Sequence, residues 1–241
     1  MIDQAYASAG LQGRLESVLR RIADCARRCG RSPEEITLVA VSKTHPAEIL
    51  SRAIDLGITN LGENRVQEAE SKIEQLGRHA VRWHLVGHLQ ANKARKAVKL
   101  FDVIHSLDST ALAQRLNRLC EEEKVDQLAV LIQVDLAGEK TKSGVTKAEL
   151  PKVAAAVKES NRLRLLGLMT LPPFFDNVEA VRPFFRELRE ARDELQGKGF
   201  FSETPGQLSM GMTHDFEVAI EEGATMVRVG TAIFGERESV K

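Results

Sequence analysis

The regular alternation of short β-rich apolar runs with longer segments of helical period constrains the fold of this chain most. Eight such runs occur, and a helical segment separates each one from the next. This order is typical of parallel strands joined by crossover helices. The predicted strands are residues 36–42, 60–62, 82–87, 103–106, 128–134, 164–169, 207–209 and 226–229. The predicted helices between them are residues 47–56, 65–76, 91–98, 111–122, 147–159, 178–196 and 213–221.

Eight strands with intervening helices suit a closed (β/α)₈ barrel, the TIM barrel of the α/β class. An open doubly wound sheet has the same order of elements, but no G-x-G-x-x-G motif follows the first predicted strand to support a dinucleotide site. The length of 241 residues fits one barrel, and no linker-like or low-complexity tract divides the chain. We predict a single barrel domain over residues 1–241.

An extra amphipathic helix precedes the barrel. Apolar side chains recur at helical spacing through residues 11–29, and Gly30 follows as a left-handed stop. Ser32, Pro33 and Glu35 then match an N-cap, a first-turn proline and a capping-box glutamate. The sequence therefore predicts a long helix and one short helical turn before the first strand.

Charge and cysteine content exclude several classes of protein. Lysine plus arginine number 34 and aspartate plus glutamate number 34, so no global field attracts nucleic acid or an anionic membrane. No apolar run is long enough to span a bilayer, and the N-terminus lacks the pattern of a secretory signal. Cys25, Cys29 and Cys120 have no disulfide spacing, which favours the reduced cytoplasm. The pair on one helix face, Cys25 and Cys29, has no cluster of further ligands, so we interpret it as core packing and not a metal site.

The carboxyl ends of barrel strands meet at one mouth, so polar residues that follow strands are candidates for function. Lys43 comes directly after the first predicted strand, and Pro46 begins the next helix. We expect Lys43 to point into the mouth, where partial desolvation supplies the neutral amine that condenses with an aldehyde. Taken alone, Lys43 is better explained as a side chain that extends from the strand end to solvent.

Two loops near the C-terminal end of the chain share a composition that suits an anion. Ser209, Gly211 and Thr213 follow the seventh predicted strand, and Gly230 and Thr231 follow the eighth. Each loop supplies a hydroxyl, a glycine and a helix start. Either loop alone fits a tight turn or a helix cap. The loops after strands seven and eight hold phosphate in many barrels, so the two together favour a phosphate site.

Three further strand ends carry residues with two possible roles. Asn64, with Gln67 three residues on, fits a helix cap and also lies where it could reach a ligand. His84 lies in or at the edge of the third strand and fits a hydrogen-bonded core histidine. Met169 ends the sixth strand as a soft apolar wall or as ordinary core.

Six ordered motifs run from about the first helix to Gly235: AVSKT (40–44), GEN (62–64) with VQE (66–68), Gly87 with LQ (89–90) and NK (92–93), GLM (167–169), LSMGM (208–212) and VRVGTAIFG (227–235). Together they closely resemble the pyridoxal phosphate homeostasis protein family. That family resembles the barrel domain of bacterial alanine racemase standing alone. The resemblance implies a protein that binds pyridoxal 5′-phosphate (PLP) without an established catalytic turnover.

Carried over to this chain, the resemblance implies that Lys43 forms the Schiff base, the internal aldimine, and that Arg228 faces the pyridine nitrogen. It implies that the phosphate is held by Ser209, Gly211, Gly230 and Thr231. It also implies that the ring is lined by Asn64 and Met169, with Met210 and His84 close by. This sequence departs from the family at Arg65, where an aromatic residue is common, and at Thr213, where serine is common.

An arginine at the pyridine nitrogen suits holding the cofactor better than strong carbanion chemistry. Guanidinium only donates hydrogen bonds, so the ring nitrogen stays without its own proton and the electron sink is weak. Alanine racemases use a tyrosine from a second domain, whereas this chain has no such domain and a single tyrosine, Tyr6, ahead of the predicted first helix. An aldimine face open to water suits uptake and release. We therefore predict a non-catalytic PLP carrier or buffer in vitamin B6 and amino-acid homeostasis, a monomer or weak dimer that transiently contacts PLP-dependent apoenzymes.

Three alternatives stay open at this point. The protein could be a slow PLP-dependent amino-acid racemase, a Schiff-base barrel that acts on a phosphorylated sugar, or a structural barrel without chemistry. A separate hypothesis concerns the glycine-bounded loop of residues 138–144, where Lys140 and Lys142 could contact the leaving cofactor.

Overall fold

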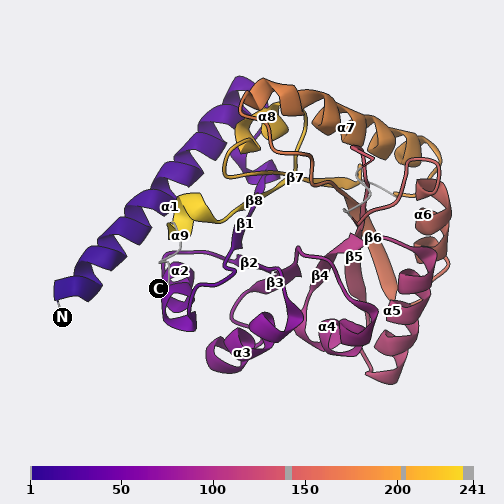
Figure 1. The fold of residues 1–241 in the computed structure, drawn as a ribbon, viewed down its shortest axis with the longest axis horizontal. Helices are drawn as coiled ribbons and strands as arrows, with labels where there is room; N and C mark the ends of the chain where they lie inside the picture. The colour runs from indigo at the N-terminus through magenta and orange to yellow at the C-terminus, as the bar shows by residue number, and fades with distance from the viewer. Residues whose placement is uncertain (1, 139–142, 202–204, 236–241) are drawn as a thin grey trace.

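The computed structural model of the protein describes residues 2–138, 143–201 and 205–235 (Figure 1). Within these residues, eight parallel strands close into a barrel in chain order, and β1 pairs with both β2 and β8. The strands are β1 Thr37–Val41, β2 Asn60–Glu63, β3 Arg82–Leu85, β4 Val103–Leu107, β5 Leu128–Gln133, β6 Leu163–Met169, β7 Gln207–Met212 and β8 Met226–Val229. The closed barrel confirms the predicted fold class and shows that the doubly wound alternative is wrong.

The helices surround the barrel and cover the outer face of the strands (Figure 1). They are α2 Ala47–Asp55, α3 Val66–Leu76, α4 Ala94–Leu100, α5 Thr110–Glu122, α6 Leu150–Lys158, α7 Arg182–Gly197, α8 Phe216–Glu221 and α9 Thr231–Phe234. Short 3₁₀ turns, η2 Ala91–Lys93 and η3 Val178–Val181, precede α4 and α7. Because helices cover one face and the barrel interior covers the other, every residue of β4 and β5 is buried.

The predicted extra helix is α1 Ile2–Arg28, which packs against α8 and α9 on one side of the barrel (Figure 1). The guanidinium of Arg21 donates two hydrogen bonds, of 3.0 and 2.8 Å, to the carboxylate of Glu217 in α8. Arg14 Nε donates to the carbonyl oxygen of Ile233 in α9 at 2.8 Å. These contacts join the start of the chain to its last two helices. No described helix is both long and apolar enough to cross a membrane.

The N-terminal helix differs from its prediction in two details. It begins at Ile2, so Tyr6 lies within α1 and not before it. Cys25 is buried in the core, as predicted, but Cys29 is exposed because it follows the last helical residue. The predicted short turn is confirmed as η1 Pro33–Glu35, where the Ser32 N–H donates to the Glu35 carboxylate at 2.9 Å.

Two residues at predicted helix starts have other roles than expected. Pro46 is the N-cap of α2, and its extended backbone makes Ala47 the first helical residue. Helix α3 begins at Val66 with Arg65 as its N-cap, and no side chain caps it. The predicted cap formed by Asn64 is therefore wrong, and Asn64 is left at the mouth of the barrel.

Candidate functional site

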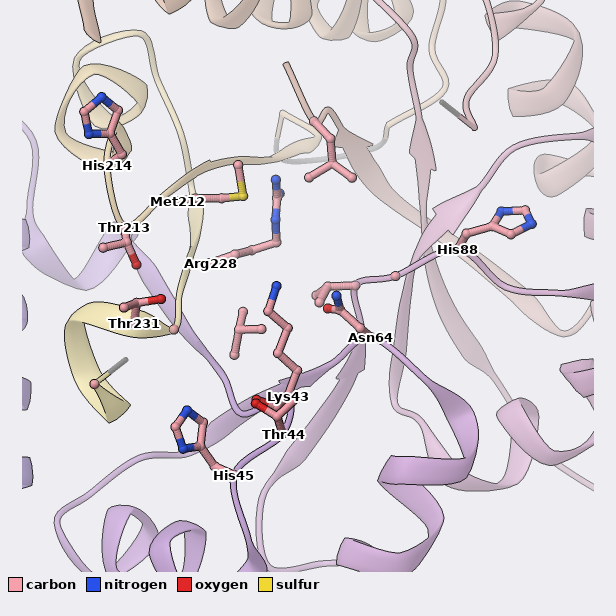
Figure 2. Close-up of a pocket in the computed structure, with 16 residues that line it drawn as sticks. Lys43, Thr44, His45, Asn64, His88, Met212, Thr213, His214, Arg228 and Thr231 are labelled. Carbon is pink, nitrogen blue, oxygen red and sulfur yellow. The ribbon is translucent and has the colours of Figure 1, made fainter. Parts of the chain in front are cut away.

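A cavity of about 610 Å³ lies at the carboxyl ends of the strands (Figure 2). Its volume is in the range that encloses one small organic ligand. Among its lining residues are Lys43, Asn64, Arg228, Gly230 and Thr231, five of the ten residues that the sequence predicted to bind a cofactor. The structure thus brings together residues from the ends of β1, β2 and β8.

Lys43 follows β1, and its half-buried side chain lines the cavity. Figure 2 shows its amine pointing toward Arg228, which confirms the predicted direction of this side chain. The neighbouring Ser42 is fully buried and points the other way, where it donates a 2.6 Å hydrogen bond to Glu63. The alternation of side chains along an extended backbone therefore turns Lys43 to the mouth.

Arg228 lies in β8 and is 3% exposed. Its Nη1 donates to Ser209 Oγ at 2.6 Å, and its Nη2 donates to the carbonyl oxygen of Thr170 at 2.8 Å. Burial lowers the pKa of Arg228 to about 10, against the opposing effect of the Asp215 charge, so the guanidinium stays protonated at neutral pH. Within the described residues Arg228 forms no ion pair.

The described residues that line this cavity include no aspartate or glutamate. Lys43 and Arg228 therefore supply positive charge without a neutralising carboxylate at the cavity surface. A partly buried site with two cations favours a ligand that carries negative charge.

A chain of hydrogen bonds runs from Arg228 through the barrel interior. Ser209 Oγ lies 2.9 Å from His105 Nδ1, His105 Nε2 lies 2.9 Å from His84 Nδ1, and His84 Nε2 lies 3.0 Å from Asn60 Oδ1. Guanidinium only donates and the Asn60 oxygen only accepts, so every donor in the chain points away from Arg228. Each histidine then carries its proton on Nε2. The negative end of each hydrogen-bond dipole therefore faces the guanidinium.

Both histidines of this hydrogen-bond network, His84 and His105, are fully buried. Burial lowers the pKa of His84 to about 3, and burial, together with the charges of neighbouring cations, holds the pKa of His105 well below its ordinary value. Both rings are therefore neutral near pH 7. The prediction of a hydrogen-bonded core histidine is confirmed for His84. His105 was missed, because a polar residue inside a predicted strand gives no functional signal by itself.

The ends of β7 and β8 place two threonines at the cavity. Figure 2 shows the hydroxyl groups of Thr213 and Thr231 facing one another. Nothing in the described part of the chain accepts a hydrogen bond from the backbone N–H of either residue. Gly230 lines the cavity beside them. Hydroxyl and free N–H groups at one edge of a positive cavity suit the oxygens of a phosphate.

The predicted end of the seventh strand is wrong, and this moves three residues away from the mouth. Strand β7 continues to Met212, three residues beyond Ser209, so Ser209 and Met210 are fully buried within it. Gly211 has φ of +88°, and a Cβ there would lie 2.5 Å from the Cβ of Ala219. Gly211 thus allows β7 to approach α8 and does not line the cavity. The residues that line the cavity at this strand end are Met212, Thr213 and His214.

Two other predicted residues also lie behind the cavity wall. Met169 is the last residue of β6 and is fully buried in a small apolar cluster, so the interpretation as ordinary core is confirmed. Leu171, two residues on, lines the cavity in its place. His84 lies inside β3 and reaches the site only through the hydrogen-bond chain to Arg228.

Asn64 lines the cavity, and the backbone at Gly87 packs closely against it. A Cβ on Gly87 would lie 2.3 Å from the carbonyl oxygen of Asn64, so only glycine fits there. The next residue, His88, also lines the cavity, although Figure 2 shows its ring pointing away from Lys43. The sequence motifs contained Asn64 and Gly87 but not His88, and the sequence gave no reason to place His88 at the site.

Comparison with known proteins extends these observations. The family described as alanine racemase, N-terminal domain, matches residues 14–238. The pyridoxal phosphate homeostasis protein of Aquifex aeolicus is 44% identical over 225 residues, which are 93% of this chain and 97% of that protein. The protein of the same name in Escherichia coli K12 is 46% identical over 232 residues, which are 94% and 97% of the two chains.

Solved structures give the same result. PipY of Synechococcus elongatus, whose structure was determined with PLP bound, is 38% identical, with a TM-score of 0.79, over 93% of this chain and 100% of PipY. Alanine racemase of Corynebacterium glutamicum is 16% identical, with a TM-score of 0.68, over 97% of this chain and 62% of the enzyme, and it shares the fold. The chain therefore belongs to the pyridoxal phosphate homeostasis protein family, within the wider family of alanine racemase N-terminal domains.

Proposed function

We propose that this protein binds PLP in the cavity at the barrel mouth, holds it as a Schiff base on Lys43, and buffers or delivers it. The observation that carries the proposal is the half-buried amine of Lys43 beside the buried guanidinium of Arg228, in a cavity whose described lining has no carboxylate. The names of the homeostasis relatives and the PLP bound to PipY support the choice of this ligand.

The residues present fit the chemical groups of this cofactor. The hydroxyl and backbone N–H groups of Thr213 and Thr231, with Gly230, suit the phosphate. Arg228 has five N–H groups and uses one nitrogen each for Ser209 and Thr170, so donors remain for a ring nitrogen. Asn64, which lines the cavity, would supply a polar group to the ring. Five residues predicted for the same site are buried behind the cavity lining and would support it without touching the cofactor. They are His84, Met169, Ser209, Met210 and Gly211.

Lys43 supplies the covalent step. Its neutral Nζ would bond to the aldehyde carbon, the aldehyde oxygen would leave as water with two hydrogens from the amine, and no electrons would pass to another molecule. Water or an incoming amine reverses the step. A site that only stores the cofactor needs this reversibility and no further proton transfer.

A carrier fits the chain's own residues better than a racemase. The single tyrosine, Tyr6, lies near the N-terminal end of α1, and Figure 1 shows this end extending away from the barrel. Arg228 leaves the ring nitrogen without a proton, which weakens the electron sink. Three histidines line the cavity: His45 lies two residues after Lys43 on the same loop, and the rings of His88 and His214 point away from Lys43 (Figure 2). A base opposite the lysine is thus missing from the described lining.

The test is an absorbance spectrum of the PLP-loaded protein and of Lys43→Ala, followed by borohydride reduction and mass spectrometry. The wild type should show the absorbance of a Schiff base and a reduced adduct on Lys43, whereas Lys43→Ala should show neither. A wild type without an adduct, or with its adduct on another lysine, contradicts the proposal.

Two further assays separate the carrier from its rivals. Mixing the loaded protein with a PLP-dependent apoenzyme should restore the activity of that enzyme. Exchange of deuterium into the Cα position of an amino acid would instead indicate the racemase. Binding of a phosphorylated sugar on Lys43 without PLP would indicate the sugar-modifying barrel.

Three other expectations accompany this proposal. We expect the protein to act in the cytoplasm, consistent with its free cysteines, and to be a monomer or weak dimer on gel filtration. The predicted role of Lys140 and Lys142 in release falls on residues 139–142, which lie outside the described part of the chain.

A further inference from the structure

A buried ionic cluster lies between β1, β2 and α3, directly beneath the residue that carries the proposed chemistry. This Lys72 cluster consists of Ser42, Glu63, Glu68 and Lys72. Lys72 Nζ donates to Glu63 Oε1 at 2.6 Å and to Glu68 Oε1 at 2.8 Å. Ser42 Oγ donates to the same Glu63 oxygen at 2.6 Å. None of its four members lines the cavity.

The Lys72 cluster holds the peptide groups on both sides of Lys43. On one side, Lys72 Nζ donates to the carbonyl oxygen of Ser42 at 2.7 Å. On the other, the backbone N–H of Thr44 donates to Glu68 Oε1. The ammonium and the carboxylate that hold these two groups are themselves bonded to each other. The backbone of Lys43 is therefore clamped from helix α3.

Thr44 has a backbone conformation that makes such a clamp necessary. Its φ is +69°, a value that a β-branched residue rarely adopts and that costs free energy. The hydrogen bond from its N–H to Glu68 helps to hold this conformation. A chain free to relax at Thr44 would turn the peptide after Lys43 and redirect its side chain.

The Lys72 cluster joins a helix to the barrel at a cost in free energy, because its charged groups are removed from water. Glu63 is fully buried, and its Oε2 has no hydrogen-bond partner among the described residues. Burial raises the pKa of Glu63, even though Lys72 and Ser42 act in the opposite direction. Two carboxylates share one ammonium. Apolar residues usually stabilise a buried interface as well or better, so stability alone does not account for this cluster.

We propose that the Lys72 cluster is a positioning device for Lys43, which rests on the proposed function of that lysine in forming a Schiff base. Lys72, Glu63 and Glu68 fix the direction in which the long, flexible side chain leaves the backbone. The amine then meets the aldehyde carbon in one orientation, and the rate of bond formation rises because fewer conformations must be searched. The cluster sets the rate at which the bond forms and breaks, and contributes little to holding the phosphate.

The variant Glu68→Ala tests this role with little risk to folding. It removes the acceptor for the Thr44 N–H, and it leaves Lys72 paired with Glu63, so no buried charge becomes unpaired. Glu70→Ala is the matched control, because it lies on the same helix and loses an ion pair with Lys96 that does not involve Lys43. Glu68→Gln serves as the rescue, since its amide oxygen can still accept from Thr44.

Two measurements separate positioning from folding. One is the rate of Schiff-base formation with PLP, measured by stopped-flow absorbance and confirmed by borohydride trapping on Lys43. The other is the affinity for pyridoxamine 5′-phosphate, which has the same phosphate but no aldehyde. Hydrogen exchange at the Thr44 amide shows whether the clamp has opened.

Glu68→Ala should slow Schiff-base formation by about ten- to a hundredfold, with pyridoxamine phosphate affinity within about twofold of wild type. Glu70→Ala should match wild type, and Glu68→Gln should recover most of the rate. The inference is overturned if Glu68→Ala speeds exchange at Thr44 but leaves the rate unchanged, or if rate and affinity fall together.

A second variant covers the buried pair. Glu63→Gln combined with Lys72→Met removes one charge of each sign and the donor to the Ser42 carbonyl. It should fold and also form the Schiff base slowly, and a wild-type rate in the folded variant would contradict the inference. A wild type that forms no adduct on Lys43 would defeat the proposed function itself, which the wild-type trapping control detects separately.

Discussion

The two cations of the cavity are held in opposite ways. Lys43 is held at its backbone, by the ionic Lys72 cluster outside the barrel, and its amine points into the cavity without a hydrogen-bond partner among the described residues. Arg228 is held at the tip of its side chain, by hydrogen bonds to Ser209 and to the Thr170 carbonyl inside the barrel. A residue that must react keeps its tip free, and a residue that must only donate has its tip fixed.

The two supports also differ in charge, and the difference has a chemical reason. A carboxylate against Arg228 would cancel the charge that an anionic ligand needs. The neutral chain of Ser209, His105 and His84 instead orients the guanidinium through dipoles. The Lys72 cluster lies behind β1 and can use full charges without neutralising the cavity. Four predictions test this contrast.

The largest effect is expected from breaking the ionic support. Lys72→Met removes the only cation of the Lys72 cluster and leaves the buried Glu63 unpaired, which should cost about 3–5 kcal/mol in the free energy of unfolding. Urea denaturation measures this. The double variant Glu63→Gln with Lys72→Met should recover most of the loss, and equal stability of the single variant and wild type would show that the cluster is not ionised.

The neutral support should give the protein a dependence on acid. A histidine that is neutral when folded and protonated when unfolded contributes stability that is lost as the pH falls below its unfolded pKa, about 6.5. The pKa of His84 is lowered to about 3, and that of His105 is also lowered. Each histidine should therefore lower the free energy of unfolding as the pH falls from about 6.5 to about 5. The slope should rise toward about 1.4 kcal/mol per pH unit at the lower end of this range.

Urea unfolding of the cofactor-free protein across this pH range measures the slope. The variant His84→Gln removes one titrating ring and should have about half the wild-type slope. An unchanged slope in the variant would mean that His84 is not the group that titrates on unfolding.

A smaller loss is expected at the fixed tip of the arginine. Arg228→Lys cannot reach Ser209 and the Thr170 carbonyl with the same planar geometry, so one buried acceptor loses its donor. This should lower the free energy of unfolding by about 1–3 kcal/mol. Arg65→Lys, at an exposed position, is the control and should change it by less than about 0.5 kcal/mol. Equal effects of the two substitutions would contradict the fixed-tip interpretation.

The smallest effect is a gain in stability beside the reactive lysine. Thr44→Gly relieves a positive φ in a β-branched residue and should raise the free energy of unfolding by about 1 kcal/mol. Lys124, at φ of +57° after α5, offers a comparison away from the site. Lys124→Gly should stabilise less, because lysine is not branched at Cβ. A loss of stability in Thr44→Gly would show that the threonine is not strained.

Most of the barrel could be predicted from the sequence because each strand and helix is a local pattern. The end of the seventh strand could not be predicted. Strand β7 extends to Met212, but the glycine within its last residues is typical of a loop. This one error placed Ser209 and Gly211 at the mouth, where only Thr213 of the three predicted loop residues lines the cavity. The register of a barrel strand depends on its neighbours, which a local pattern does not contain.

The sequence by itself determined the alternation of strands and helices, and with it the meeting of Lys43, Gly230 and Thr231 at one mouth. Only the tertiary structure decided how the reactive groups are supported. His105 and Ser209 are 104 residues apart, and Lys72 reaches a carbonyl 30 residues earlier. Such partners become neighbours only when the barrel closes, because hydrogen bonds and ion pairs act over a few ångströms and carry no trace in local spacing.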